Sequence, residues 1–326
     1  MTPKVLAIRR APATSARSLG ANRKLRHGQI FRPAGLALLC FALLTGCSTH
    51  SLSLFHPKGP IAATELHMMI IDAVIMLGII IPTALLVTWF LWRYRASTSR
   101  GSYDPNWSHS TTIEVVVWSV PLMVVAVLGY YSYKGVYEVN PYHPTVIARK
   151  ADGAPIEVDV IATDWQWLFI YPKQHIAAID ELVIPAHIRV QFHLTSAAVT
   201  NSFFIPELVG QIYVMPGMPT EQAMMVSDPG TYRGFSAALS GPGFSWMQFQ
   251  TRAVTERKFA RWVAHLQNSP RHLTFPAFDQ LARPTINVHQ TPQYYSHVQS
   301  GLFDHVIEEV RMGKVFTTPM AMTAHM

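Results

Sequence analysis

Histidine and cysteine are the residue types in this chain best suited to binding a metal, but their spacing predicts no metal site. The chain has 15 histidines and two cysteines, Cys40 and Cys47, which both lie near the N-terminus. His187 and His193 fall on one predicted strand, where six residues at about 3.3 Å each place them roughly 20 Å apart, too far to share an ion. No glycine-rich phosphate loop or nucleophile elbow follows a predicted strand. The residue types therefore indicate no catalytic centre.

Two carboxylates lie inside long apolar segments. Glu114 is at the start of one segment, and Asp72 is about one turn inside another. Charged residues in membrane segments are costly, which makes Glu114 a functional candidate. The alternative for Glu114 is a favourable interaction with the N-terminus of a helix. Asp72 is close enough to the predicted membrane surface to stay hydrated, which favours a residue without a functional role. The alternative is that Asp72 makes a polar contact with a neighbouring subunit.

Residues 1–46 are predicted to be a lipoprotein signal peptide. They contain eight basic residues and no acidic one, and the apolar run 34–44 is too short to span a bilayer. Cys47 follows Leu44, Thr45 and Gly46, which resembles a bacterial lipobox whose cysteine is lipidated and becomes the mature N-terminus. The alternative is an uncleaved anchor with an incidental cysteine.

The basic character of the chain comes from this leader. Removing its eight positive charges from the formal net charge of +7 leaves −1 for the remainder. The charge distribution therefore does not favour a nucleic-acid partner. Because both cysteines lie in or directly after the leader, we expect no disulfide framework in the exported part.

Two apolar segments are long enough to span a membrane as helices, residues 68–92 and 113–133. Between them, the loop 93–112 carries Arg93, Arg95 and Arg100 against one acid, Asp104, which predicts a cytoplasmic loop. The N-terminal segment 47–67 and everything after the second span are then periplasmic. The lipobox requires the same orientation.

After a linker at 134–151, the hydrophobic period changes from helical to alternating. Short alternating runs separated by proline and glycine turns predict a Greek-key β-sandwich over about residues 152–254. From 255 onward the period is helical again, with Thr255 as a candidate N-cap and an apolar stripe at Phe259, Trp262, Val263 and Leu266. Residues 255–326 are therefore expected to form a helical, aromatic-rich C-terminal region.

Several motifs resemble subunit II of the haem–copper oxidases, and in particular of cytochrome bo-type ubiquinol oxidases. They cover nearly the whole chain after the leader, and they include W-R-Y-R-A-S at 92–97, N-W-S-H-S at 106–110, D-W-Q-W-L-F-I-Y-P at 164–172, S-F-F-I-P-E-L at 202–208 and S-G-P-G-F-S at 240–245. The resemblance implies a two-helix transmembrane hairpin followed by a cupredoxin-like sandwich.

The resemblance also implies that a copper site has been lost. Subunit II of cytochrome c oxidases holds two copper ions with thiolate, imidazole, thioether and carbonyl ligands. On that pattern the corresponding positions in this chain, called here the six degenerate copper positions, are Asn201, Ser236, Ala238, Ser240, Phe244 and Met247. Only Met247 keeps its ligand type, and soft copper needs thiolate and imidazole.

By resemblance, the chain is a subunit of a complex that oxidises ubiquinol, reduces oxygen to water and pumps protons in the bacterial inner membrane. Haems, copper and the quinol site are expected in subunit I, with smaller subunits and membrane lipid as further partners. This chain is then expected to have no cofactor and no active site, and Glu114 is expected near the mouth of a proton channel. The resemblance leaves open ubiquinol or menaquinol as reductant.

The same resemblance places Trp165 and Trp167 where members that use cytochrome c accept electrons. Without copper behind them, we expect both to pack in the sandwich or against subunit I, and Met247 to be core filler. Two rival interpretations are a cytochrome c oxidase subunit with an unusual electron entry, and a cupredoxin-like lipoprotein that acts as a binding module outside any oxidase.

Overall fold

The computed structural model describes residues 53–95, 108–142, 145–148, 151, 153–286 and 291–316. The predicted signal peptide 1–46 and the lipidation site Cys47 lie outside the described residues, and so do Arg100 and Asp104 of the predicted cytoplasmic loop.

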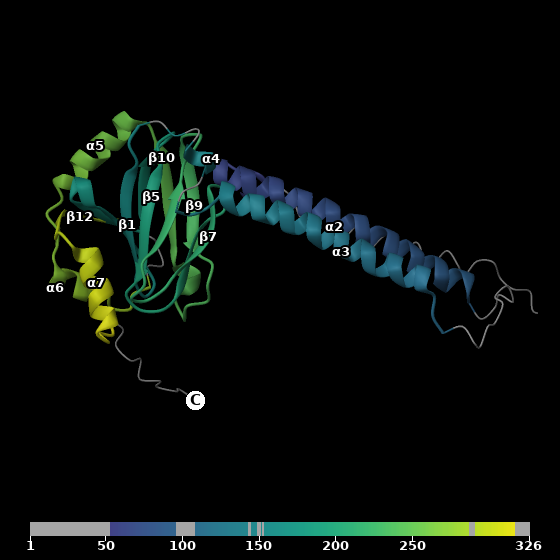
Figure 1. Ribbon diagram of the computed structural model, residues 1–326. Helices are drawn as coiled ribbons and strands as arrows, with labels where there is room; N and C mark the ends of the chain where they lie inside the picture. The colour runs from purple at the N-terminus through teal and green to yellow at the C-terminus, as the bar shows by residue number, and fades with distance from the viewer. Residues whose placement is uncertain are drawn as a thin grey trace, which may run out of the picture. The chain divides into compact units, whose positions relative to one another are not determined.

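Two long helices, α2 (Pro60–Arg93) and α3 (Thr111–Glu138), run side by side as a hairpin (Figure 1). Both are long and apolar enough to cross a bilayer, which confirms the prediction of two such helices. Each helix is longer at both ends than the apolar span predicted for it. The first and last turns of the helices carry polar residues, so the hydropathy pattern did not include them. Pro60 at the first position of α2 suits a helix start, since its missing N–H would be unpaired there.

The strands after the hairpin form two packed sheets, which confirms the predicted cupredoxin-like sandwich (Figure 1). In the described part of the chain, the larger sheet consists of β1 (Ile156–Ala162), β2 (Trp167–Tyr171), β3 (Ile176–Ile179), β5 (Val190–Ser196), β8 (Thr220–Met224), β11 (His272–Leu273) and β12 (Gln293–Val298). The smaller sheet consists of β4 (Glu181–Pro185), β6 (Asn201–Ile205), β7 (Val209–Val214), β9 (Gly230–Ser236) and β10 (Gln248–Val254).

The strand orders are β11-β12-β3-β2-β1-β5-β8 and β4-β10-β9-β6-β7. Most neighbouring strands are antiparallel, but β1 pairs with β5, β4 with β10 and β11 with β12 in parallel. The remaining short elements are η3 (Ser53–Phe55), α4 (Thr145–Ala148), η4 (Pro172–Gln174), η5 (Phe244–Trp246), α5 (Glu256–Gln267), α6 (Phe275–Leu281) and α7 (Leu302–Arg311).

The main core lies between the two sheets and is aromatic at its centre. The ring of Trp167 meets those of Phe203 and Phe249 edge-on, at centroid distances of 5.5 and 5.7 Å, and the two phenyl rings stack at 5.3 Å. Gly234 lies directly against the Phe249 ring, where a Cβ atom would overlap it. A glycine is therefore required here by close packing.

A second core covers the outer face of the larger sheet. Leu168 and Ile170 of β2 point into it, whereas Trp167 and Phe169 point into the main core. Phe278 of α6 and Val306 of α7 cover these outward side chains. The C-terminal region thus buries the second face of the sheet.

The predicted helical C-terminal region is confirmed by α5, α6 and α7, but it also contains a strand. β12 pairs with β3 and extends the larger sheet, since Tyr294 and Tyr295 favour a strand against an open sheet edge. One expectation about local structure needs correction. His187 was expected on a strand with His193, but it lies in a turn with φ of 65° and donates its backbone N–H to Val226 O. The predicted stripe on α5 is confirmed, because Phe259 and Leu266 are buried in the main core.

Candidate functional site

The strand pairing of the smaller sheet brings several degenerate copper positions together. Asn201 begins β6 and Ser236 ends β9, which are neighbouring strands. The Ser236 hydroxyl donates to Asn201 Oδ1 at 3.0 Å. The backbone N–H of Ser236 donates to Met247 O, also at 3.0 Å, and the Met247 side chain is fully buried in the main core. Its predicted role as core filler is confirmed.

The other degenerate positions lie on the loop from β9 to η5. The Ser236 hydroxyl is also within 3.4 Å of Ala238 O, which the sequence pattern places at a metal-contacting position. Ser240 O accepts a hydrogen bond from Trp165 Nε1 at 3.3 Å, while the Ser240 hydroxyl is buried without a partner among the described residues. Phe244 is half-buried and packs against the main core.

The side chains at these positions do not fit copper. They are an amide, two hydroxyls, a methyl, a phenyl ring and one thioether, whereas copper of this kind prefers thiolate and imidazole. Neutral hydrogen bonds between Asn201, Ser236 and the neighbouring backbone hold the strand ends together instead. We therefore assign no step of chemistry to a metal at these positions.

Trp165 and Trp167 are buried, with exposed fractions of 5% and 0%. The Trp165 ring lies beneath Gly241 and Gly243, and a Cβ atom at Gly243 would overlap it. This confirms the expectation that both tryptophans pack within the sandwich. Trp165 supports the loop from β9 to β10, residues 237–247, which is called here the copper-type loop. Trp167 fills the main core.

Glu114 lies in the first turn of α3, as predicted, with Ser110 as the N-cap residue. The Glu114 side chain is exposed in this chain, and its backbone N–H donates to Ser110 O at 3.0 Å. Asn106 and Trp107 of the same motif lie outside the described residues. Asp72 is half-buried in α2, twelve residues after Pro60 and so about three turns into the helix.

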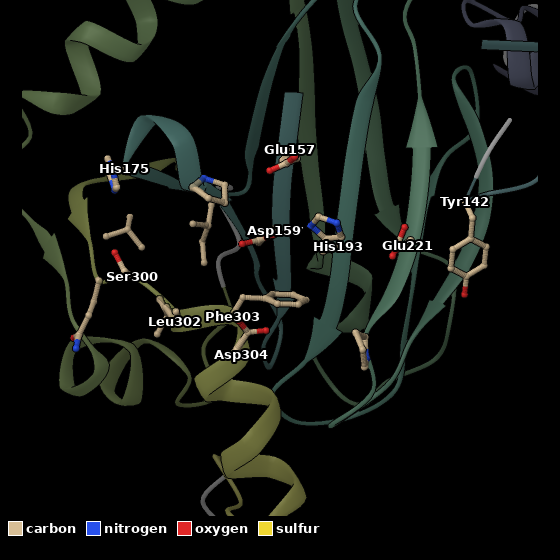
Figure 2. Close-up of a pocket in the computed structure, with 16 residues that line it drawn as sticks. Tyr142, Glu157, Asp159, His175, His193, Glu221, Ser300, Leu302, Phe303 and Asp304 are labelled. Atoms are coloured by element: carbon tan, nitrogen blue, oxygen red, sulfur yellow. Dashed lines mark hydrogen bonds and ion pairs between the residues drawn. The ribbon is translucent and has the colours of Figure 1, made fainter. Parts of the chain in front are cut away.

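A pocket of about 580 Å³, which no sequence pattern predicts, lies on the outer face of the larger sheet beside the first turn of α7 (Figure 2). Its lining combines apolar side chains such as Phe303 with acidic ones and two histidines. The titratable side chains that line it are Tyr142, Glu157, Asp159, His175, His193, Glu221 and Asp304. Among the described residues, no group of three or more His, Cys, Asp or Glu side chains is placed to hold a metal ion.

An ion pair between His193 and Asp159 lies at the centre of this pocket. The two residues are opposite each other on the parallel strands β1 and β5, with His193 Nδ1 3.1 Å from Asp159 Oδ1. The hydrogen bond to Asp159 raises the pKa of His193, burial opposes the shift, and the negative charges of Asp159, Glu221 and Glu157 add to it. The alternating pattern of each strand predicts which of its side chains share a face. It does not predict that β1 and β5 are neighbours, and that pairing is what brings Asp159 and His193 into contact.

Two family models match the chain. Residues 172–254 match "Cytochrome C oxidase subunit II, periplasmic domain", and residues 267–314 match "COX Aromatic Rich Motif". The second match covers much of the region that buries the outer face of the larger sheet.

Curated relatives extend the similarity over most of the chain. Cytochrome bo(3) ubiquinol oxidase subunit 2 of Pseudomonas putida is 40% identical over 252 residues, which is 77% of this chain and 78% of the relative. Ubiquinol oxidase subunit 2 of Acetobacter aceti is 39% identical over 273 residues, 84% of this chain and 86% of the relative. Quinol oxidase subunit 2 of Bacillus cereus is 33% identical over 252 residues, 77% of this chain and 84% of the relative.

The raised pKa of His193 predicts a specific pH dependence of stability. A group whose pKa rises on folding stabilises the folded state below its unfolded pKa, and that contribution is lost as pH rises through the folded value. His193→Gln should therefore lower the free energy of unfolding at acidic pH and have less effect at alkaline pH. Denaturant unfolding of the full chain in detergent, from about pH 5 to about pH 9, measures this difference.

Asp159→Asn is the matched variant, because it removes the main cause of the shift while keeping the side-chain shape. An NMR titration should show His193 with a lower pKa in this variant. Equal His193 titration curves in the wild-type chain and in Asp159→Asn would contradict the assignment.

Proposed function

Because the chain belongs to the ubiquinol oxidase subunit 2 family, we propose that it is the second subunit of a proton-pumping quinol oxidase and carries no redox centre itself. The complex oxidises ubiquinol and reduces oxygen to water. Haems, the active-site copper and the quinol site belong to subunit I. The work of this chain is structural: it covers subunit I on the periplasmic side and supports assembly.

One observation carries the proposal: the six degenerate copper positions hold side chains unsuited to copper, and neutral hydrogen bonds join them instead. The Ser236–Asn201 hydrogen bond and the packing of Trp165 under the loop occupy the place of metal bonds. An electron port at the sandwich surface would need a metal and an exposed aromatic contact, and Trp165 is 5% exposed. Electrons then enter the complex inside the membrane, through quinol.

The two apolar helices and the family match to a periplasmic domain indicate an inner-membrane protein. In the proposed arrangement α2 and α3 both span the membrane, Cys47 carries the lipid anchor, and the sandwich is periplasmic. Large apolar side chains of the helices, including Leu85, Trp118 and Leu122, are exposed in the isolated chain. These faces suit contact with lipid, subunit I and the smaller subunits.

The proposal predicts that this chain is isolated with a haem-bearing partner. A tag on the C-terminus, used to purify the chain from mild detergent, should recover a large subunit with haem and copper in fixed ratio. After dissociation, the chain itself should contain less than one copper per ten molecules. Recovery of the chain alone, in cells that make the oxidase, would support a lipoprotein that binds ligands outside any oxidase.

Glu114 is proposed to supply protons to the entrance of a channel in subunit I. Glu114→Gln removes the titratable proton and keeps the shape, so quinol-driven turnover should fall about a hundredfold, the lower end of the usual range for a proton-transfer group. Haem content should stay unchanged. Glu138→Gln, at the other end of α3, is the matched control, and oxygen uptake together with proton release is the measurement. Full turnover and full proton delivery in Glu114→Gln would eliminate this role.

A further inference from the structure

Two histidines of the C-terminal region lie side by side at the edge of the larger sheet. His272 is on the edge strand β11, and His297 is on the neighbouring strand β12. Their ring centroids are 5.0 Å apart, and the rings are nearly perpendicular, at an interplanar angle of 78°. Both residues are exposed. The pair shares no residue with the degenerate copper positions or with the pocket around His193.

A β-bulge in β12 brings the two side chains together. His272 pairs with Ser296 and Leu273 pairs with Val298, so His297 is an extra residue between the two pairs. In a regular strand, successive side chains point to opposite faces of the sheet. His297 instead has a φ of 52°, where residues other than glycine are uncommon, and its ring meets the Ser296 side chain. Backbone strain of this kind is concentrated at functional sites.

The two imidazole rings each direct one nitrogen atom toward the same oxygen atom. Ser296 Oγ is 3.3 Å from His272 Nδ1 and 3.1 Å from His297 Nδ1. The hydroxyl proton of Ser296 is used elsewhere, because Ser296 Oγ donates to Ser269 O at 2.7 Å. The lone pairs of Ser296 Oγ are therefore left for the side of the two histidines. The result is a group of two imidazole nitrogens and one hydroxyl oxygen.

The spacing of these three atoms fits a transition-metal ion. With bonds of about 2.0–2.1 Å, a tetrahedral ion holds its ligand atoms roughly 3.3 Å apart. The two nitrogen–oxygen distances at Ser296 are close to this value, and both are longer than the usual N–H···O hydrogen bond of about 2.9–3.0 Å. Imidazole suits Zn²⁺, Cu²⁺ and Ni²⁺, whereas Mg²⁺ and Ca²⁺ prefer oxygen ligands. The adjacent cation, Arg271, donates to Gln293 Oε1 at 2.9 Å.

We propose that His272 and His297 bind one divalent transition-metal ion through their Nδ1 atoms, with Ser296 Oγ as a third contact and water in the open position. When the ion binds, the proton on each Nδ1 moves to Nε2 of the same ring, so neutral imidazoles release no net proton. The ion joins β11 to β12 and thereby stabilises the C-terminal region. The proposal does not depend on how electrons enter the complex.

The direct test is calorimetric titration of the purified complex with Zn²⁺, after treatment with a chelator. The purification tag must contain no histidine, and chelation also empties this exposed site before any copper count on the chain. One saturable Zn²⁺ site is expected, with Cu²⁺ tighter and Mg²⁺ without detectable binding. Zn²⁺ should raise the Tm of this chain, since it binds the folded state. The affinity should fall as the pH is lowered, because protonated imidazole cannot bind a metal.

Substitutions assign the Zn²⁺ site to this pair. Asparagine adopts the left-handed backbone readily, so His297→Asn removes a ligand and keeps the bulge. His297→Asn and His272→Asn should each abolish the Zn²⁺ site. Ser296→Ala removes the oxygen that positions both rings and should weaken Zn²⁺ binding by about tenfold to a hundredfold. His265→Asn, at an exposed histidine of α5, is the matched control and should leave the affinity unchanged.

The absence of a saturable Zn²⁺ site below about 1 mM in the wild-type complex would overturn the proposal. Equal losses in His265→Asn and His297→Asn would also overturn it, because the binding would then not belong to this pair. The Tm of each metal-free variant identifies damage to the fold. If one histidine variant is damaged, the other decides, and a Zn²⁺ site that persists in a variant with the wild-type Tm contradicts the assignment.

Discussion

The fold depends on burying both faces of the larger sheet. Along β2, Trp167 and Phe169 fill the space between the sheets, and Leu168 and Ile170 point the opposite way into the second core. An exposed sheet with an apolar outer face would be an aggregation hazard. The C-terminal region removes that hazard, since α6 and α7 cover the face and β12 pairs with β3, which would otherwise be the edge of the sheet. The aromatic-rich region is thus part of the sandwich.

That double burial explains how the copper-type loop keeps its shape. Strands β6 and β9 are held by the aromatic core around Phe203 and Phe249, so Asn201 and Ser236 are brought together by the sheet. The loop after β9 then rests on the Trp165 ring, which the close approach of Gly241 and Gly243 allows. Once packing and neutral hydrogen bonds define the loop, metal ligands are not needed for folding.

The sequence predicted what depends on local pattern. Two apolar runs predicted α2 and α3, and the stripe from Phe259 to Leu266 predicted the buried face of α5. The expected burial of Trp165, Trp167 and Met247 is confirmed, because large apolar side chains without a ligand role belong in a core. The lipid anchor at Cys47 and the proton role of Glu114 stay predictions.

What the sequence did not predict depends on contacts between distant segments. Strand β12 was not predicted because it forms by backbone pairing with β3, which lies more than a hundred residues earlier in the chain. The Asp159–His193 pair requires the parallel pairing of β1 with β5, which no alternation pattern specifies. Local periodicity predicts which face of a helix or strand is apolar. Contacts between distant segments determine which of these faces pack together.

The central claim is that the sandwich is a scaffold and that electrons reach the complex through quinol. Oxygen uptake by the purified complex, with either quinol or reduced cytochrome c as electron donor, tests it most directly. The account predicts uptake with quinol and none above background with cytochrome c. Sustained uptake with cytochrome c would contradict it, because an electron port would then have to exist despite the side chains at Asn201, Ser236 and Ser240.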